Sequence, residues 1–139
     1  MSRKSKGTNA ERDLVHRFWS KGWPCVRVAG SGCSRYPSPD IIAGNKERMV
    51  AIECKTTKDN SKYFPKEEIR LLREFSTQIG AEPWVGIRFG REDWFFLSLD
   101  DLKDTGECLM ASLDLARQKG LITDELIGIF KQEPRDDNV

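Results

Sequence analysis

The sequence has a single histidine, four cysteines and no long apolar run. Cys25, Cys33, Cys54 and Cys108 form no Cys-x-x-Cys pair, and with one histidine they supply too few ligands at the spacing that a structural zinc site requires. The sequence also lacks a stretch of eighteen apolar residues and a basic leader followed by an apolar segment, so it predicts neither a membrane span nor a secretory signal. We therefore expect a cytoplasmic protein with reduced cysteines.

Charge is unevenly distributed along the chain, although the formal net charge is only +1. Residues 1–73 carry sixteen Lys or Arg and eight Asp or Glu, a net charge of +8, whereas residues 74–139 carry seven and fourteen, a net charge of −7. A basic half favours an anionic partner, for which nucleic acid is the commonest candidate. The alternative is a solvated surface whose charges balance in three dimensions.

The predicted order of elements is a helix, three strands, a second helix and two strands. In the first helix, over 8–21, Thr8 is the expected N-cap and Glu11 closes a capping box with it. A stretch rich in glycine, proline and serine at 30–39 predicts a loop. The remaining predicted elements are strands at 23–29, 40–43 and 49–55, a helix at about 65–79, and strands at 84–89 and 94–97.

The length of 139 residues suits one domain that can bury a core. Because a strand, helix, strand passage crosses over to a parallel neighbour, we expect an α/β fold with a central mixed sheet of about five strands flanked by helices. The predicted domain has a core over 8–97 and a basic N-terminal arm at 1–7. It also has short C-terminal helices or a terminal strand within 99–130 and a frayed end at 131–139.

Two carboxylates and a lysine occupy the predicted hairpin, where aliphatic residues would be usual. If a four-residue loop at 45–48 closes the hairpin, Ala43 faces Val50 and Asp40 faces Glu53. Opposed carboxylates destabilise a sheet unless a cation neutralises them. Carboxylates without histidine or cysteine partners favour a hard ion, so the pattern predicts Mg²⁺, with Mn²⁺ as a substitute.

Lys55 shares a strand face with Glu53, and Glu11 lies on the inward face of the first helix. Glu11, Asp40 and Glu53 are therefore the candidate metal ligands. Each residue also has a structural interpretation: Glu11 as half of a capping box, Asp40 as a turn residue, and Glu53 with Lys55 as a surface pair.

Four residues form one sequence pattern: Pro39 and Asp40 are followed, after twelve residues, by Glu53, any residue and Lys55. With the surrounding stretches "RKSKGTNAERDLVHRFWSKGWPCVRVAGSG", "SPDIIAG" and "AIECKTTK", it resembles the archaeal Holliday junction resolvases. These are small dimeric nucleases of the restriction-endonuclease-like PD-(D/E)xK fold. The resemblance covers residues 3 to about 97.

The resemblance implies roles for particular residues. The catalytic set would be Glu11, Asp40, Glu53, Lys55 and a loop serine, either Ser34 or Ser31. DNA contacts would come from Arg3, Lys4, Lys6, Arg12, Arg27, Ser31, Arg35, Lys58, Lys62 and Lys66. The dimer interface would use Ile69, Leu72, Phe75 and Ile79, of which Ile79 departs from the aromatic residue of the family.

The function that the resemblance implies is Mg²⁺-dependent endodeoxyribonuclease activity that resolves four-way DNA junctions in recombination and repair. A homodimer is the expected unit, and replication or repair proteins are candidate partners. Two alternatives are another nuclease of the same fold that cuts duplex DNA, and a catalytically silent nucleic-acid-binding module in which the charged residues form a structural network.

Overall fold

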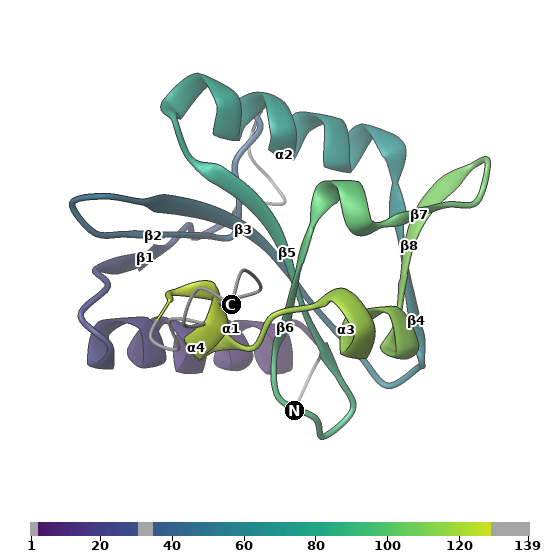
Figure 1. Cartoon of the computed structure of the whole chain (residues 1–139), viewed down its shortest axis with the longest axis horizontal. Coiled ribbons are helices and arrows are strands. Elements are labelled where there is room, and N and C mark those ends of the chain that lie inside the picture. Colours follow the sequence, from purple (N-terminus) through teal and green to yellow (C-terminus); the bar gives the residue numbers. More distant parts are fainter. Residues whose placement is uncertain (1–2, 31–34, 129–139) are drawn as a thin grey trace, which may run out of the picture.

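The computed structural model describes residues 3–30 and 35–128, and the side chains of residues 7–30 and 35–128. Its centre is a five-stranded sheet of order β1-β2-β3-β5-β6 (Figure 1). The strands are β1 (Cys25–Arg27), β2 (Ile41–Gly44), β3 (Met49–Thr57), β5 (Glu82–Phe89) and β6 (Phe95–Ser98). Only the β3–β5 pair within this sheet is parallel, so the predicted mixed sheet is confirmed.

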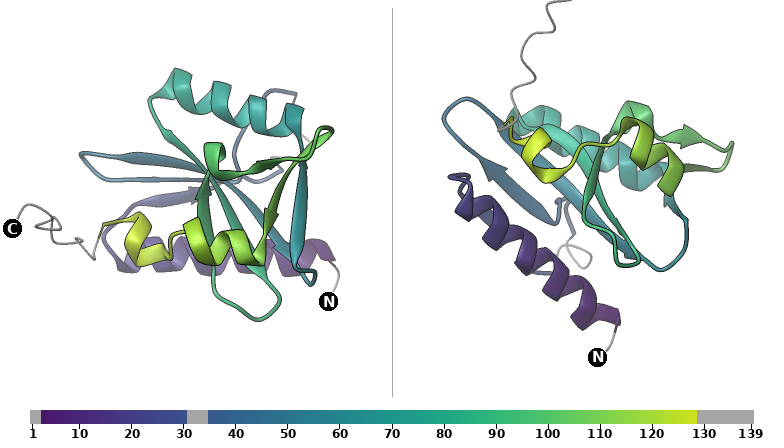
Figure 2. Two further views of the ribbon diagram at one scale, coloured as in Figure 1. Left: turned by 45° about the vertical axis from the view of Figure 1, so that its right-hand side comes forward. Right: turned by 60° about the horizontal axis from the view of Figure 1, so that its bottom comes forward.

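Two long helices, α1 (Arg3–Ser20) and α2 (Lys66–Ile79), lie on opposite sides of this sheet (Figures 1 and 2). Alternation along β3 divides its side chains between two cores. Val50, Ile52 and Cys54 pack with Leu14 and other residues on the α1 side, whereas Ala51 packs on the α2 side. The sheet is therefore buried on both faces along its apolar part, which fixes the orientation of the charged residues that follow Ile52.

The first helix begins at Arg3, so the predictions of an N-terminal arm at 1–7 and of an N-cap at Thr8 are wrong. Arg and Lys are good helix formers. The single glycine, Gly7, costs about 1 kcal/mol relative to alanine, which is too little to end a helix anchored by buried Leu14 and Phe18. The helix therefore runs through Gly7.

The second helix begins and ends close to its predicted bounds. Pro65 precedes its first residue, and Gly80 follows it in the left-handed region with φ of 80°, donating its N–H to the carbonyl groups of Ser76 and Thr77. Glycine adopts this conformation without the steric cost that a Cβ atom brings, so the helix ends here.

A second, three-stranded sheet of order β4-β8-β7 stands beside the first. Its strands are β4 (Ser61–Pro65), β7 (Lys103–Asp104) and β8 (Cys108–Ser112), and the chain continues with α3 (Leu113–Lys119) and α4 (Thr123–Leu126) after a turn of 3-10 helix, η2 (Leu99–Asp101). The short helices were predicted, but β4 was not. Among the described residues, no helix is long and apolar enough to cross a membrane.

Candidate active site

The hairpin of β2 and β3 has the predicted register. Ala43 lies opposite Val50 and Ile41 lies opposite Ile52. Asp40 directly precedes β2, and its backbone N–H donates to the carbonyl of Ile52 at 3.0 Å. The same register therefore brings Asp40 beside Glu53, as the loop length predicts.

Strand β3 continues past the end of β2, and this creates an open strand edge. The last residue of β3 that pairs with β2 is Ile52, although β3 extends to Thr57. Instead of a strand, the side chain of Asp40 approaches this edge, and its Oδ2 accepts the N–H of Cys54 at 2.8 Å. Because the N–H and C=O of one strand residue point to the same side, the carbonyl of Cys54 faces this edge too.

Glu53 is the most strongly perturbed carboxyl group of the site. Burial and hydrogen bonds with the carboxyl groups of Asp40 and Glu68 raise its pKa from 4.5 to about 10, although the positive charge of Lys55 opposes this shift. Without a bound metal ion, Glu53 therefore holds a proton at neutral pH. A divalent ion bound by Asp40 and Glu53 would displace that proton.

Lys55 extends from β3 toward α2, where its Nζ lies 3.1 Å from Oε1 of Glu68. Burial lowers the pKa of Lys55, but the negative charges of Glu68 and Glu53 outweigh this effect and raise it above its ordinary value. The lysine is therefore a cation at neutral pH. Glu68 was not predicted as a site residue; the available signal was its position one helical turn before the inward-facing Leu72.

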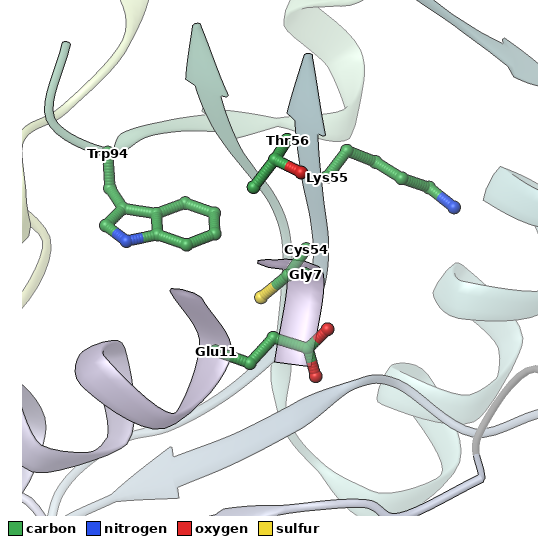
Figure 3. A pocket seen from close by; sticks show the side chains of 6 residues that line it. All are labelled: Gly7, Glu11, Cys54, Lys55, Thr56 and Trp94. Atoms are coloured by element: carbon green, nitrogen blue, oxygen red, sulfur yellow. The ribbon is translucent and has the colours of Figure 1, made fainter. Parts of the chain in front are cut away.

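Glu11 lies on the other side of β3, where α1 packs. It lines a cavity of about 230 Å³ together with Gly7, Cys54, Lys55, Thr56 and Trp94. Figure 3 shows the sulfur of Cys54 directed toward the α1 side, near Glu11, whereas Lys55 extends away from it. Burial and the charge of Asp40 raise the pKa of Glu11 to about 7, against the opposing charge of Arg27, whose NH1 atom is 3.8 Å from Oε1.

These residues do not form one compact ring of ligands. Within the described part of the chain, no group of three or more His, Cys, Asp or Glu residues is arranged to hold a metal ion. The structure brings together the carboxyl groups of Asp40 and Glu53, but it leaves Glu11 beside Arg27. Two touching carboxyl groups and a nearby strand carbonyl are the oxygen donors that Mg²⁺ and Mn²⁺ prefer, so the donor chemistry fits such an ion.

The predicted DNA-contacting residues lie on several elements, from α1 and β1 to β4 and the start of α2. Arg12, Arg35 and Lys58 are exposed, Arg27 and Lys62 are half-buried, and Lys66 pairs with Asp104 at 3.1 Å. Arg3, Lys4 and Lys6 lie in the first two turns of α1. Ser31 and Ser34 lie outside the described residues.

Two of the four predicted interface residues belong to the core of the chain itself. Ile69 and Leu72 are 3% and 6% exposed and pack with Val85 on the α2 side of the sheet, so their assignment to a dimer interface is wrong. The inward face of an amphipathic helix covers its own sheet first. Phe75 is half-buried and Ile79 is exposed, so these two are accessible at the surface.

Comparisons with known proteins agree with this geometry. A family model described as archaeal Holliday junction resolvase (Hjc) matches residues 2–134. The crossover junction endodeoxyribonuclease Hjc of Archaeoglobus fulgidus is 38% identical over 130 residues, which cover 94% of this chain and 95% of the relative. The protein of the same name from Sulfolobus acidocaldarius is 35% identical over 130 residues, covering 91% and 90%.

A solved structure has the same fold. The 1.6 Å structure of Archaeoglobus fulgidus Hjc, described as a Holliday junction resolvase from an archaeal hyperthermophile, superposes with a TM-score of 0.82 at 35% identity. The superposition covers 88% of this chain and 100% of the other. This confirms the restriction-endonuclease-like fold predicted from the sequence. The family model that matches residues 2–134 and the relative that is 38% identical show that the chain belongs to the archaeal Holliday junction resolvase family.

Proposed function

We infer that this chain is a crossover junction endodeoxyribonuclease that resolves four-way DNA junctions by hydrolysing phosphodiester bonds. The observation that carries this inference is the hydrogen bond between the carboxyl groups of Asp40 and Glu53, with the charge of Lys55 close by, on the part of β3 whose edge β2 no longer covers. Relatives that bear this enzyme name align with nearly the whole chain.

Members of this family are metal-dependent nucleases, and we propose that the ion here is Mg²⁺, with Mn²⁺ as a substitute. Asp40 and Glu53 would hold it, together with the carbonyl of Cys54 on the same strand edge. Such an ion supplies Lewis-acid polarisation of the phosphoryl group and lowers the pKa of a bound water. Glu11 pairs with Arg27 and, within the described residues, does not form a three-ligand group with this pair, so its contribution requires movement or an intervening water.

The chain's own residues orient the reacting groups. The ammonium of Lys55 stands on the same strand face as Glu53, where it can donate to a phosphate oxygen and stabilise negative charge that develops there. The carboxylate of Asp40 is fixed by the N–H of Cys54, so it is preorganised before DNA binds. Desolvation by the surrounding core strengthens these electrostatic interactions.

DNA binding is proposed to rest on contacts with phosphate groups. The first turns of α1 carry Arg3, Lys4 and Lys6 and no acidic residue. Positive charges at a helix N-terminus are unfavourable in the free protein, whereas a phosphate group there interacts favourably with both the charges and the backbone N–H groups. Because such contacts carry no base information, recognition would depend on the branched shape of the junction, and binding would weaken steeply with salt.

A homodimer is the proposed working unit, because one active site cuts one strand and a junction must be cut in two. An apolar surface supports this proposal on the side of the sheet that α2 occupies. Val26, Met49 and Ile79 are 58%, 37% and 40% exposed, and Phe75 is half-buried. Val26 and Met49 face that side because their neighbours Cys25 and Val50 face the α1 core.

The decisive experiment is a cleavage assay with Mg²⁺ on a synthetic four-way junction beside a linear duplex of the same arms. The wild-type protein is expected to nick the junction at symmetric positions, and Glu53→Gln is expected to bind the junction without cutting it. Equal cutting of duplex would instead assign the chain to general nucleases of this fold. Binding by the wild type without cutting would favour a silent nucleic-acid-binding module.

Calorimetric titration with Mn²⁺ tests the metal assignment separately. The wild type is expected to bind Mn²⁺, and Glu53→Gln is expected to lose this binding. Glu47→Gln is the matched control, because Glu47 is exposed in the turn of the same hairpin and stands apart from the site. Unchanged Mn²⁺ binding in Glu53→Gln would contradict the assignment.

A further inference from the structure

Glu68 connects the second helix to the active site. It lies in the first turn of α2, and its Oε1 is 3.1 Å from Nζ of Lys55, with the two side chains 28% and 32% exposed. Its carboxyl group is also hydrogen-bonded with that of Glu53. The neighbouring Ile69 is 3% exposed and packed in the core, so this turn of the helix is anchored.

We propose that Glu68 is a positioning residue for strand cleavage, which holds the ammonium group of Lys55 in place beside Glu53. This inference rests on the proposed nuclease function and assigns to it a residue outside the Pro-Asp and Glu-x-Lys pattern.

The chemistry of lysine gives the first reason. Its ammonium group sits on a flexible four-carbon stem and is not oriented by itself. It has three N–H donors. One donor directed at Glu68 fixes the group and leaves two donors for a phosphate oxygen and an attacking water.

The second reason is the set of anions around Lys55. Besides Glu68, the carboxyl groups of Glu53 and Asp40, which are the proposed metal ligands, place negative charge near Lys55, and Glu11 also interacts electrostatically with it. Without Glu68, the ammonium group would pair with the two proposed ligands and compete with the ion for their oxygens. Glu68 therefore supplies the lysine with a partner that the metal does not need.

The third reason is that α2 favours a carboxylate at this point. The N-terminus of a helix carries a partial positive charge, which stabilises acidic side chains in the first turn. Glu67 and Glu68 both lie there, but Glu67 is 64% exposed and pairs with Arg70 at the surface. Glu67 thus lies in the same helical turn as Glu68 and carries the same charge, but it pairs with Arg70 and not with Lys55, so it provides a matched control.

The test is single-turnover cleavage of a four-way junction by the wild type and by Glu68→Gln, Glu68→Asp and Glu67→Gln. Because a displacement of about 1 Å can lower a rate about 100-fold, we expect Glu68→Gln to cut about 10- to 100-fold more slowly, with junction affinity in Ca²⁺ unchanged within about twofold. Glu68→Asp should recover part of the rate, and Glu67→Gln should cut at the wild-type rate.

A double-mutant cycle shows whether Glu68 acts through Lys55. If it does, Lys55→Met with Glu68→Gln should cut no more slowly than Lys55→Met alone. In calorimetry, Glu68→Gln should bind Mn²⁺ a few-fold more weakly than the wild type, and the added Lys55→Met change should restore that binding by removing the competing cation.

The outcomes separate the two levels of inference. A wild-type protein that leaves the junction uncut would overturn the proposed function and this inference together. A wild type that cuts, with Glu68→Gln equally fast, would overturn the positioning role alone. The positioning role would also be overturned if the rate losses of the two single variants multiplied in the double variant. It would be overturned too if Lys55→Met failed to restore Mn²⁺ binding, because Glu68 would then be a metal ligand.

Discussion

At the scale of single residues, the site contains a carboxyl group whose ionisation opposes the stability of the fold. The ordinary carboxyl pKa is 4.5, and in the folded protein burial raises that of Glu53 to about 10. Between these values the folded state binds a proton that the unfolded state releases. The free energy of unfolding therefore decreases as pH rises through this range, and it is highest below pH 4.5 as far as this group is concerned.

Replacing Glu53 by glutamine should remove this pH dependence, because glutamine does not titrate. In the metal-free protein, the free energy of unfolding of Glu53→Gln relative to wild type is expected to increase from pH 5 to pH 9 by up to about 1.4 kcal/mol per pH unit. Urea unfolding in the presence of a chelator measures this difference. The control Glu47→Gln should follow the wild-type curve, and a Glu53→Gln curve parallel to wild type would contradict the assignment of the proton to Glu53.

The sequence predicted the central residues of this site but not all their neighbours. Asp40, Glu53 and Lys55 were predictable because a four-residue loop sets the hairpin register and alternation sets the strand face. Glu68 was not, because its contact with Lys55 depends on where α2 docks against the sheet, which no local pattern specifies. Glu11 was predicted on the inward face of its helix, but its pairing with Arg27 depends on where β1 lies against α1, which no local pattern specifies.

At the scale of elements, the difference in length between β2 and β3 produces the site. Had β2 continued, its backbone would have paired with β3 beyond Ile52 and taken the N–H of Cys54 that Asp40 now binds. Pro39 precedes Asp40 and cannot donate a backbone hydrogen bond, so it favours a β2 strand that begins only after this point. A strand that is shorter than its neighbour in this way leaves backbone atoms of the longer strand open to substrate without disturbing the core below.

Elements that depend on distant partners were the ones missed. The strand β4 pairs with β8, which begins more than forty residues later at Cys108. The segment Ser61–Pro65 is short and ends in proline, so only its tertiary pairing identifies it as a strand. In contrast, α2 was predicted within one residue, because its apolar period and the flanking Pro65 and Gly80 are local signals.

The hairpin of β2 and β3 is held to the rest of the molecule by Arg48. Its Nε and NH2 atoms donate to Glu82 at 2.7 and 2.8 Å, NH1 donates to the carbonyl of Leu126 at 2.7 Å, and its guanidinium lies 5.4 Å from the ring centre of Trp23. One side chain thereby connects the hairpin turn to β5, to the end of α4 and to the residues before β1.

Removing this connection should destabilise the fold while leaving the active-site residues in place. Arg48→Ala is expected to lower the free energy of unfolding by about 1 to 3 kcal/mol, because it breaks charge-assisted hydrogen bonds and leaves the carbonyl of Leu126 without this donor. Arg48→Lys should recover only part, since lysine lacks the planar fork. Urea unfolding tests this, with Lys46→Ala in the same exposed turn as the control, and a loss below about 0.5 kcal/mol for Arg48→Ala would contradict it.

At the scale of the whole molecule, the proposed activity requires two sites that act on one junction. We propose that Val26, Met49, Phe75 and Ile79 together form an apolar surface on the α2 side of the sheet, the side to which Lys55 and Glu68 also belong. A two-fold axis through this surface would pair identical patches and relate two active sites by symmetry. Core residues Ile69 and Leu72 would support it from beneath without belonging to it.

The variant Ile79→Glu tests this arrangement, because it places two charges in contact across a two-fold interface. We expect it to shift the protein from dimer to monomer at micromolar concentration, as measured by light scattering. On a plasmid bearing an extruded cruciform, the wild type should yield linear product from paired nicks, whereas Ile79→Glu should accumulate nicked circles. Ile122→Glu is the matched control, since Ile122 is 43% exposed and lies outside this surface, and a dimeric Ile79→Glu protein that still yields linear product would place the interface elsewhere.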